Sequence, residues 1–356
     1  MKDQHGATLQ HPSGLTVLVT GASGFLRHGL LSRLRGRMAP GAAIRGVIDG
    51  CQPYAGRGWP ASVREGIGGR PPVQACGDDL AHTVDAVVHL SSASALLPDP
   101  DRAARLTRHV LEFADRAGAP LYYVGSAFSP LAAREPGIRT RDDVAEEEMI
   151  LGSGLPHVVI RPSIVIGDGT TAMTSVLPGI YEIFDAIIGA RFERLPVNPD
   201  YFLDLIPSGT VADVIVALVE HRVTDGEYWL TNGEHALTVG QIRDLIVESA
   251  REIGVDIGQL ACETAPVGDR GQDRPFLTGI SSVQRRKVLM LIDLLVRTAI
   301  QDEPLETSLG DRFETSIGEL GAMGVPALLE QRSTLRTGLR AWFDIVGPPV
   351  GRSVVA

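Results

Sequence analysis

The sequence predicts an α/β fold in which a doubly wound parallel sheet carries helices on both faces, and two observations lead to it. The first is a buried strand at 17–19, followed by Gly21-Ala22-Ser23-Gly24 and by apolar residues at helical spacing from 25 to 34. The second is the regular alternation of short apolar stretches with helical patterns up to about residue 167. Such alternation is typical of a parallel sheet.

The further elements of the first half follow from the same periodicities. Apolar stretches predict strands at 43–49, 72–80, 85–92, 121–126 and 157–162. Apolar residues at helical spacing predict helices at 102–117 and 142–151. These stretches supply the strands and crossover helices that a doubly wound sheet needs.

From residue 170 the pattern becomes mostly helical. Helices are predicted at 176–188, 211–221, 238–253, 283–300 and 332–343, with a proline-containing loop at 194–207 and a short strand at 228–230. We expect a disordered leader (1–13), a first domain of Rossmann type (14–167, completed by about 208–233) and a smaller, mostly helical substrate lobe (168–207 and 234–356).

Composition excludes several classes of protein. The chain has 356 residues and a net charge of −10, and it has no block of Lys or Arg, so nucleic acid is not expected as a partner. The apolar run at 288–296 is interrupted by Asp293 and is too short to span a bilayer. The three isolated cysteines form no metal-binding pattern, and the first residues lack the apolar core of a signal peptide. We therefore expect a cytoplasmic protein without a metal site.

The turn between the first strand and helix indicates a phosphate-binding function. Backbone N–H groups at the start of a helix bind a pyrophosphate in dinucleotide-binding folds. Gly21 and Gly24 fit that pattern, but Arg27 stands where a third glycine is expected. Asp49 ends the second predicted strand, where a carboxylate accepts hydrogen bonds from the adenosine ribose and repels a 2′-phosphate. The alternative is that Asp49 only begins a turn with Gly50.

Several stretches of the chain resemble one enzyme superfamily. They are VTGASGFL, GDDL, VDAVVHLSS, LYYVGSA, SGLPHVVIRPSIVIGD, FLDLIPSGTVADVIVAL, YWLTNGEHALTVGQI and RFETSIGELGAMGVP. The sequence resembles the extended short-chain dehydrogenase/reductase superfamily from about residue 15 to 343. Within it, the similarity is greatest to the thioester reductase and fatty acyl-CoA reductase ("male sterility") branch.

The resemblance implies a set of residues that contact a nicotinamide dinucleotide. These are Gly21, Ser23, Gly24, Phe25, Asp49, Asp78, Asp79, Leu90, Ser91, Pro162 and Ser163. Reductases of this branch often carry Arg at the end of the second strand to hold the 2′-phosphate of NADP(H). Because Asp49 stands there, NAD(H) is favoured over NADP(H).

The resemblance also implies a catalytic set of Ser or Thr, a Tyr-x-x-x-Lys pair and often Asn. Ser126 occupies the first position, whereas counting back from Ser153-Gly154 puts Arg139 at the Tyr position and Asp143 at the Lys position. No tyrosine lies between residues 123 and 181, and no lysine lies between residues 2 and 287. Ala103 stands where the Asn is expected. The pair that donates the proton in hydride transfer is therefore missing.

Other groups are candidates for replacement chemistry. Arg139 does not give up its proton, but its guanidinium could hold an anionic or enolic oxygen. Asp142, Asp143 and Glu146–Glu148 could include a general base, although a solvated acidic helix face is the favoured interpretation. Tyr201 and Asp204, on a loop expected to cover the substrate, are further acid/base candidates. His109 and His157 are expected to be structural.

Three hypotheses remain, in this order. The first is a redox-neutral enzyme, such as a cyclase, isomerase or dehydratase, acting on an acyl or polyketide-type small molecule that is either free or bound to a carrier protein. The second is an NAD(P)H-dependent thioester or aldehyde reductase with replaced catalytic groups. The third is a non-catalytic cofactor-binding or scaffold protein. The sequence allows a homodimer in each case.

Overall fold

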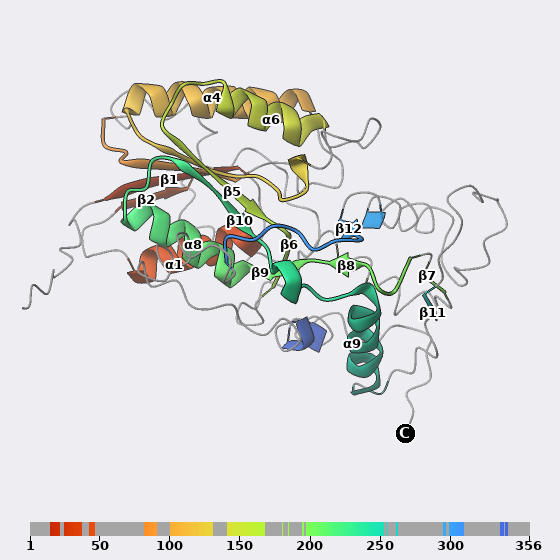
Figure 1. Ribbon diagram of the computed structural model, residues 1–356. Coiled ribbons are helices and arrows are strands. Elements are labelled where there is room, and N and C mark those ends of the chain that lie inside the picture. The colour runs from red at the N-terminus through yellow and green to blue at the C-terminus, as the bar shows by residue number, and fades with distance from the viewer. Residues whose placement is uncertain are drawn as a thin grey trace, which may run out of the picture.

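The computed structural model describes residues 15–21, 25–37, 43–46, 82–90, 100–130, 141–167, 180, 184, 194–195, 197–252, 254, 261–262, 295–296, 299–309, 335–337 and 339–340. Its centre is a sheet of six strands in the order β10-β5-β4-β3-β1-β2, and every neighbouring pair is parallel (Figure 1). The strands are β1 (Thr16–Gly21), β2 (Ala43–Gly46), β3 (Ala86–Leu90), β4 (Leu121–Val124), β5 (His157–Pro162) and β10 (Gly226–Leu230).

This sheet confirms the predicted doubly wound α/β fold. Strand β1 lies between β2 and β3, so the chain runs outward to β2 and then returns to the other side of β1. Such a reversal is a topological switch point, and the crevice beside it is where open α/β sheets bind ligands. The strand predicted at 72–80 lies outside the described residues.

Helices cover both faces of the sheet (Figure 1). Helices α1 (Phe25–Arg37) and α8 (Ser208–Glu220) pack together on one face, where Arg33 Nε donates to Asp213 Oδ1 at 3.0 Å. Helices α4 (Pro100–Ala117) and α6 (Arg141–Leu151) pack together on the other. The described helices of the first domain therefore begin and end close to their predicted bounds.

Alternation along the strands explains the two apolar layers. Val17 and Val19 point to the cluster formed with α1 and α8, whereas Leu18 points to the cluster formed with α4. Both faces are covered, so the strands are continuous apolar runs and do not alternate with polar residues.

A third hydrophobic cluster lies in the second part of the chain. It gathers residues from two small strand pairs and from helix α9 (Val239–Glu252), including Leu203, Leu205 and Ile242, together with Leu335 from a later part of the chain. The pairs are β6 (Ile164–Ile166) with β9 (Leu205–Pro207), and β8 (Phe202–Leu203) with β12 (Ile300–Gln301). A separate core of this kind supports the proposed division into two lobes, which stays a prediction.

Two predictions for this part were wrong in detail. The segment 194–207 is not only a loop, because β7 (Arg194–Leu195), β8 and β9 lie in it, and β7 pairs with β11 (Ala261–Cys262). Leu203, Leu205 and Ile206 are buried in these strands, and their apolar contacts outweigh the neighbouring prolines. The helix predicted at 283–300 does not reach its expected end, since Ile300 belongs to β12.

Helix α9 confirms the prediction that Thr238 opens a helix. The Gln241 N–H donates to Thr238 Oγ1 at 3.3 Å, and the Thr238 N–H donates to Gln241 Oε1 at 3.0 Å. This reciprocal pair is a capping box. Of the helices predicted at 176–188 and 332–343, only a few residues are described, and those are helical.

The segment 304–309 runs along the outer edge of β10. The Trp229 N–H donates to Ser308 Oγ at 2.9 Å, and the Ser308 N–H donates to the Trp229 carbonyl oxygen at 2.8 Å. Thr307 Oγ1 donates to the Thr231 carbonyl oxygen at 2.7 Å. These contacts satisfy backbone groups of β10 that its neighbour β5 does not reach. None of the helices in the described part of the chain is both long and apolar enough to cross a membrane.

Candidate active site

The carboxyl ends of four sheet strands meet along one edge. Strand β1 ends at Gly21, β3 at Leu90 and β5 at Pro162, while β4 is followed by Gly125 and Ser126. Predicted cofactor and catalytic residues thus lie at the ends of adjacent strands. The parallel topology brings them together although they are far apart in the sequence.

Gly21 makes the closest backbone approach at this edge. Its φ is +91°, and a Cβ placed on it would lie 1.8 Å from the Leu90 carbonyl oxygen. A side chain would therefore separate the ends of β1 and β3, on the two sides of the switch point. Glycine is therefore required at this tight turn, where the end of β1 packs against the end of β3.

A buried histidine lies one residue before the end of β3. His89 is fully buried, with Thr20 Oγ1 2.9 Å from Nδ1 and Thr107 Oγ1 3.3 Å from Nε2. Burial lowers the pKa of His89 to about 4, so the ring is neutral and links β1, β3 and α4 through two hydroxyl groups. Sequence reasoning did not single out His89, because a His inside an apolar strand has no motif of its own.

Ser126 is held with its side chain in a defined direction. The Phe128 N–H donates to Ser126 Oγ at 3.1 Å, and the Ser126 carbonyl oxygen accepts from the Ser129 N–H at 3.3 Å. The neighbouring N–H groups of Gly125 and Ala127 donate to β5 carbonyl oxygens, both at 2.9 Å. Because Oγ accepts from a backbone donor, the hydroxyl proton is available for an acceptor on a bound ligand.

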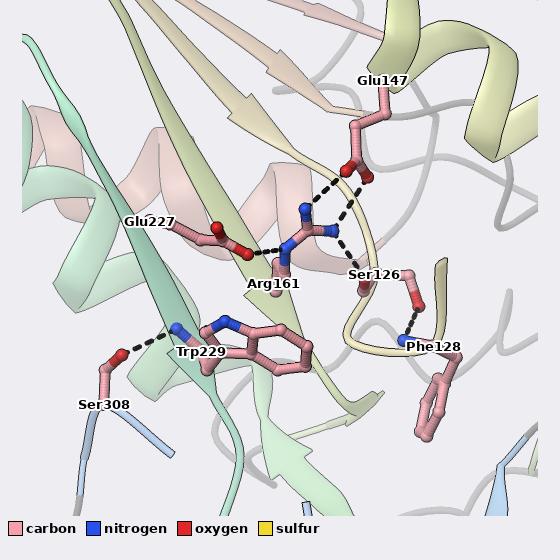
Figure 2. A network of polar contacts seen from close by, with 7 residues as sticks. All are labelled: Ser126, Phe128, Glu147, Arg161, Glu227, Trp229 and Ser308. Carbon is pink, nitrogen blue, oxygen red and sulfur yellow. Dashed lines mark hydrogen bonds and ion pairs between the residues drawn. The ribbon is translucent and has the colours of Figure 1, made fainter. Parts of the chain in front are cut away.

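Arg161 lies next to Ser126, at the centre of the network in Figure 2. Its guanidinium donates to both carboxylate oxygens of Glu147, from Nη1 at 2.8 Å and from Nη2 at 2.5 Å. Its Nε donates to Glu227, and its Cζ lies 5.4 Å from the centroid of the Trp229 ring. Nη1 also reaches the Ser126 carbonyl oxygen at 3.5 Å.

The positive charge of Arg161 is buried and is balanced by the carboxylates of Glu147 and Glu227. Arg161 is only 4% exposed. Burial alone lowers the pKa of Arg161, but the hydrogen bonds and charges of Glu147 and Glu227 raise it above its ordinary value. The guanidinium therefore stays charged and is held in one orientation by two carboxylates and a ring.

The favoured interpretation of the acidic helix as a solvated face was wrong for two of its residues. Glu146 and Glu147 on α6 are buried, whereas Glu148 is exposed. Burial of Glu147 follows from its pairing with Arg161, which lies fourteen residues away and shows no helical periodicity with it. A run of carboxylates alone does not reveal which member has a distant cation as its partner.

Asp204, between β8 and β9, is a buried hub at the ends of β5 and β10. It is 2% exposed and accepts from Ser163 Oγ at 2.7 Å, from the Asn232 N–H at 2.7 Å and from Asn232 Nδ2 at 2.6 Å. Burial raises the pKa of its carboxyl, and hydrogen bonds from Ser163, Asn232 and Gly233 oppose that rise. Asp204 thus lies in the interior and not on an exposed covering loop, and these contacts favour a role in holding the ends of β5 and β10.

Tyr201 differs from Asp204 in its surroundings. Its side chain is 38% exposed, and its carbonyl oxygen accepts the Val239 N–H at 2.8 Å at the start of α9. Tyr201 precedes the short strand β8 and is partly exposed to solvent, whereas Asp204 follows it and is buried. Both stay predictions as acid/base groups.

The structure leaves several predicted site residues undescribed. Ser23, Gly24, Asp49, Asp78, Asp79, Ser91 and Arg139 lie outside the described residues. The backbones of Phe25 and Asp143 belong to the first turns of α1 and α6, but their side chains, like that of Arg27, lie outside the description. His157 Nδ1 lies 2.8 Å from the Leu155 carbonyl oxygen, in agreement with its expected structural role.

Within the described residues, no group of three or more His, Cys, Asp or Glu side chains is arranged to hold a metal ion. No protein-family model matches the sequence, and no curated protein matches it.

Solved structures do match the whole fold. The terminal R domain from the myxalamid PKS-NRPS biosynthetic pathway superposes with a TM-score of 0.64 at 19% identity, over 95% of this chain and 93% of that one. The reductase (R) domain of a non-ribosomal peptide synthetase from Mycobacterium tuberculosis gives 0.61 at 18% identity, over 95% and 94%. The Bordetella bronchiseptica enzyme WbmH in complex with NAD+ gives 0.59 at 17% identity, over 94% and 99%.

These neighbours share the α/β fold described above. Reductase domains and an NAD+-bound enzyme share this arrangement along nearly their whole length. The chain therefore shares the Rossmann-type α/β fold of these reductase domains and of the NAD+-bound enzyme, in agreement with the fold that its motifs predicted.

Proposed function

We propose that this protein is an enzyme that catalyses a redox-neutral reaction, such as cyclisation, isomerisation or dehydration, on an acyl or polyketide-type substrate. The observation that carries the proposal is the combination at Ser126. Its hydroxyl is held at the carboxyl end of β4 with the proton available, while the sequence that follows holds Arg139 and Asp143 where hydride transfer needs Tyr and Lys.

The chemistry follows from these groups. The Ser126 hydroxyl donates a hydrogen bond to a substrate carbonyl oxygen, and the Arg139 guanidinium stabilises the charge that develops there. Asp143 takes the proton from the carbon next to the carbonyl, which gives an enolate. The enolate then expels a β-hydroxyl group, which leaves as water with the proton that Asp143 had taken. Alternatively it regains that proton at another carbon, or it attacks a second carbonyl whose oxygen receives the proton. No step requires net transfer of a hydride.

Gly21 lies at the switch point of the sheet, the position at which open α/β folds bind a dinucleotide. Gly21, Leu90 and Pro162 would hold it through backbone approach, and Asp49 favours NAD(H) over NADP(H). A bound dinucleotide supplies a hydride donor or acceptor, of which the proposed reaction makes no net use. Two of the fold neighbours are named as reductase domains of PKS or NRPS systems, which supports an acyl substrate attached to a carrier protein.

The test uses a simple thioester in the absence of nucleotide. Purified protein is incubated with 3-hydroxybutyryl-N-acetylcysteamine in D2O, and NMR follows deuterium at the α-carbon and formation of the crotonyl thioester. We expect both to depend on the protein and to fall about 100-fold or more in Ser126→Ala, the loss typical of removing one oxyanion donor. Conversion only with added NADH, together with a net reduced product, would contradict the proposal.

A second candidate is an NAD(P)H-dependent reductase of thioesters or aldehydes. The bare backbone at Gly21 and the similarity to reductase domains favour it. The same thioester is then offered with NADH or NADPH, and nucleotide oxidation is followed by absorbance. Absence of NADH and NADPH binding in calorimetry removes this candidate.

A further inference from the structure

We propose that Glu147 and Arg161 are positioning residues that set the orientation of Ser126. The inference rests on the proposed function, because it assigns a purpose to a network next to the proposed oxygen-binding hydroxyl. Arg161 was not among the residues that the sequence assigned to the site, and Glu147 was named only as one of several possible general bases on the acidic helix.

The guanidinium of Arg161 is held in one orientation by its contacts. Glu147 holds Arg161 through two parallel hydrogen bonds, and Glu227 and the Trp229 ring fix the guanidinium from two further sides (Figure 2). Nη1 donates to the Ser126 carbonyl oxygen at 3.5 Å as well as to Glu147. A guanidinium held on these sides cannot rotate without breaking a charged hydrogen bond.

Ser126 is sensitive to this restraint. Strand β4 ends at Val124, so the peptide of Ser126 lies just beyond the regular sheet. Arg161 contacts its carbonyl oxygen, and the Phe128 N–H contacts Oγ at 3.1 Å. Without the Arg161 contact, the Ser126–Ala127 peptide is held by the Ser129 N–H at 3.3 Å and by the Ala127 N–H on the Pro162 carbonyl oxygen at 2.9 Å, so the direction of the hydroxyl is fixed less closely.

Glu147 also joins Ser126 to the start of α6. It lies four residues, about one turn, after Asp143 on the same helix. The Glu147–Arg161 pair therefore fixes the distance between the two elements that carry the proposed oxygen donor and the proposed base. Small displacements in such a pair cost rate because the reacting groups must be aligned.

The central test is a double-mutant cycle between Glu147→Gln and Ser126→Ala, with turnover of the 3-hydroxybutyryl thioester as readout. Glu147→Gln keeps the shape of the side chain but removes its charge. We expect kcat to fall roughly 10- to 100-fold with little change in KM. In the Ser126→Ala background the same substitution is expected to have almost no further effect. If the fold-losses of kcat in the two single variants multiply in the double variant, the two residues act independently and the proposal is overturned.

Asp213→Asn is the matched control. It removes a partly buried ion pair with Arg33 on the opposite face of the sheet. We expect its kcat to equal that of the wild type. An equal loss of kcat in both variants would show that Glu147 acts only through general stability, which overturns the proposal. The variant Glu147→Asp, which restores the charge, is expected to recover part of the lost kcat.

Hydrogen exchange gives a readout that needs no activity. The Phe128 amide is protected by Ser126 Oγ, so Glu147→Gln is expected to raise its exchange rate about tenfold relative to amides of α8. This measurement separates the two proposals, because it succeeds even if no thioester is turned over. Unchanged protection overturns the positioning role. If Glu147→Gln does not fold, Glu227→Gln, which removes the more exposed carboxylate, takes its place in each measurement.

Discussion

At the scale of single residues, Gly21 carries two separable constraints. One is its φ of +91°, and the other is the Leu90 carbonyl oxygen, 1.8 Å from where a Cβ would stand. The first is a backbone strain that any L side chain meets, whereas the second is a collision that only moving β1 from β3 relieves.

We expect Gly21→Ala to lower the free energy of unfolding by about 3 kcal/mol or more, because strain and collision add. Gly154→Ala is the control, since φ is +72° there and nothing lies within 4 Å of the added Cβ. It should cost only about 1 kcal/mol. Urea unfolding measures both, and similar losses in the two variants would contradict the collision.

His89 makes stability depend on pH. Its pKa of about 4 in the folded protein lies below the ordinary value of 6.5. Between pH 4 and pH 6.5 the imidazole is therefore protonated in the unfolded chain but neutral in the folded protein. Stability is therefore lost as pH falls from 6.5 towards 4, by up to about 3 kcal/mol. Urea titrations of the wild type and of His89→Gln measure this, and we expect a flatter pH dependence in the variant. Equal slopes would count against it.

At the scale of elements, helix starts and strand cores were predictable because their causes are local. The Thr238 capping box follows from residues three apart, and strand β5 was predicted with its bounds at residues 157 and 162. The short strands β8 and β9 were missed because their pairing partners, Ile300 and Ile164, lie far along the chain. Pairing over such distances leaves no periodic signal in a window of sequence.

The capping box gives a prediction for α9. Replacing Thr238 by Ala removes the acceptor for the Gln241 N–H, which we expect to cost about 1 kcal/mol of unfolding free energy. Thr238→Ser keeps the hydroxyl and should retain most of the stability. Thermal unfolding of both variants tests the difference, and equal midpoints would show that the cap contributes nothing.

In the candidate site, too, residues with a local sequence signal were predictable and residues whose role depends on distant contacts were not. Ser126 and Gly21 were predictable because each belongs to a short contiguous motif at a strand end. Arg161, Glu147 and His89 were not, because their roles depend on contacts between α6, β5, β3 and β10 that exist only after folding. Buried polar residues are conspicuous in a structure but ordinary in a sequence.

At the scale of the whole molecule, Asp204 joins the segment between β8 and β9 to the ends of the sheet strands β5 and β10. Asp204→Ala would leave Ser163 Oγ and the Asn232 N–H buried without this acceptor, and we expect a loss of about 3 kcal/mol in unfolding free energy. Asp200→Ala, at an exposed position four residues earlier, should be neutral within about 0.5 kcal/mol. Chemical denaturation compares them, and a small loss at Asp204 would contradict the hub.

The contacts of residues 304–309 with β10 have a consequence for the order of synthesis. Thr307 covers Thr231 from 76 residues further along the chain. At typical rates of translation the outer edge of β10 is therefore without this cover for roughly 4 to 15 s after it is made. An uncovered strand edge can pair with another chain. We therefore expect edge-to-edge pairing between copies to be favoured until the late segment covers this edge.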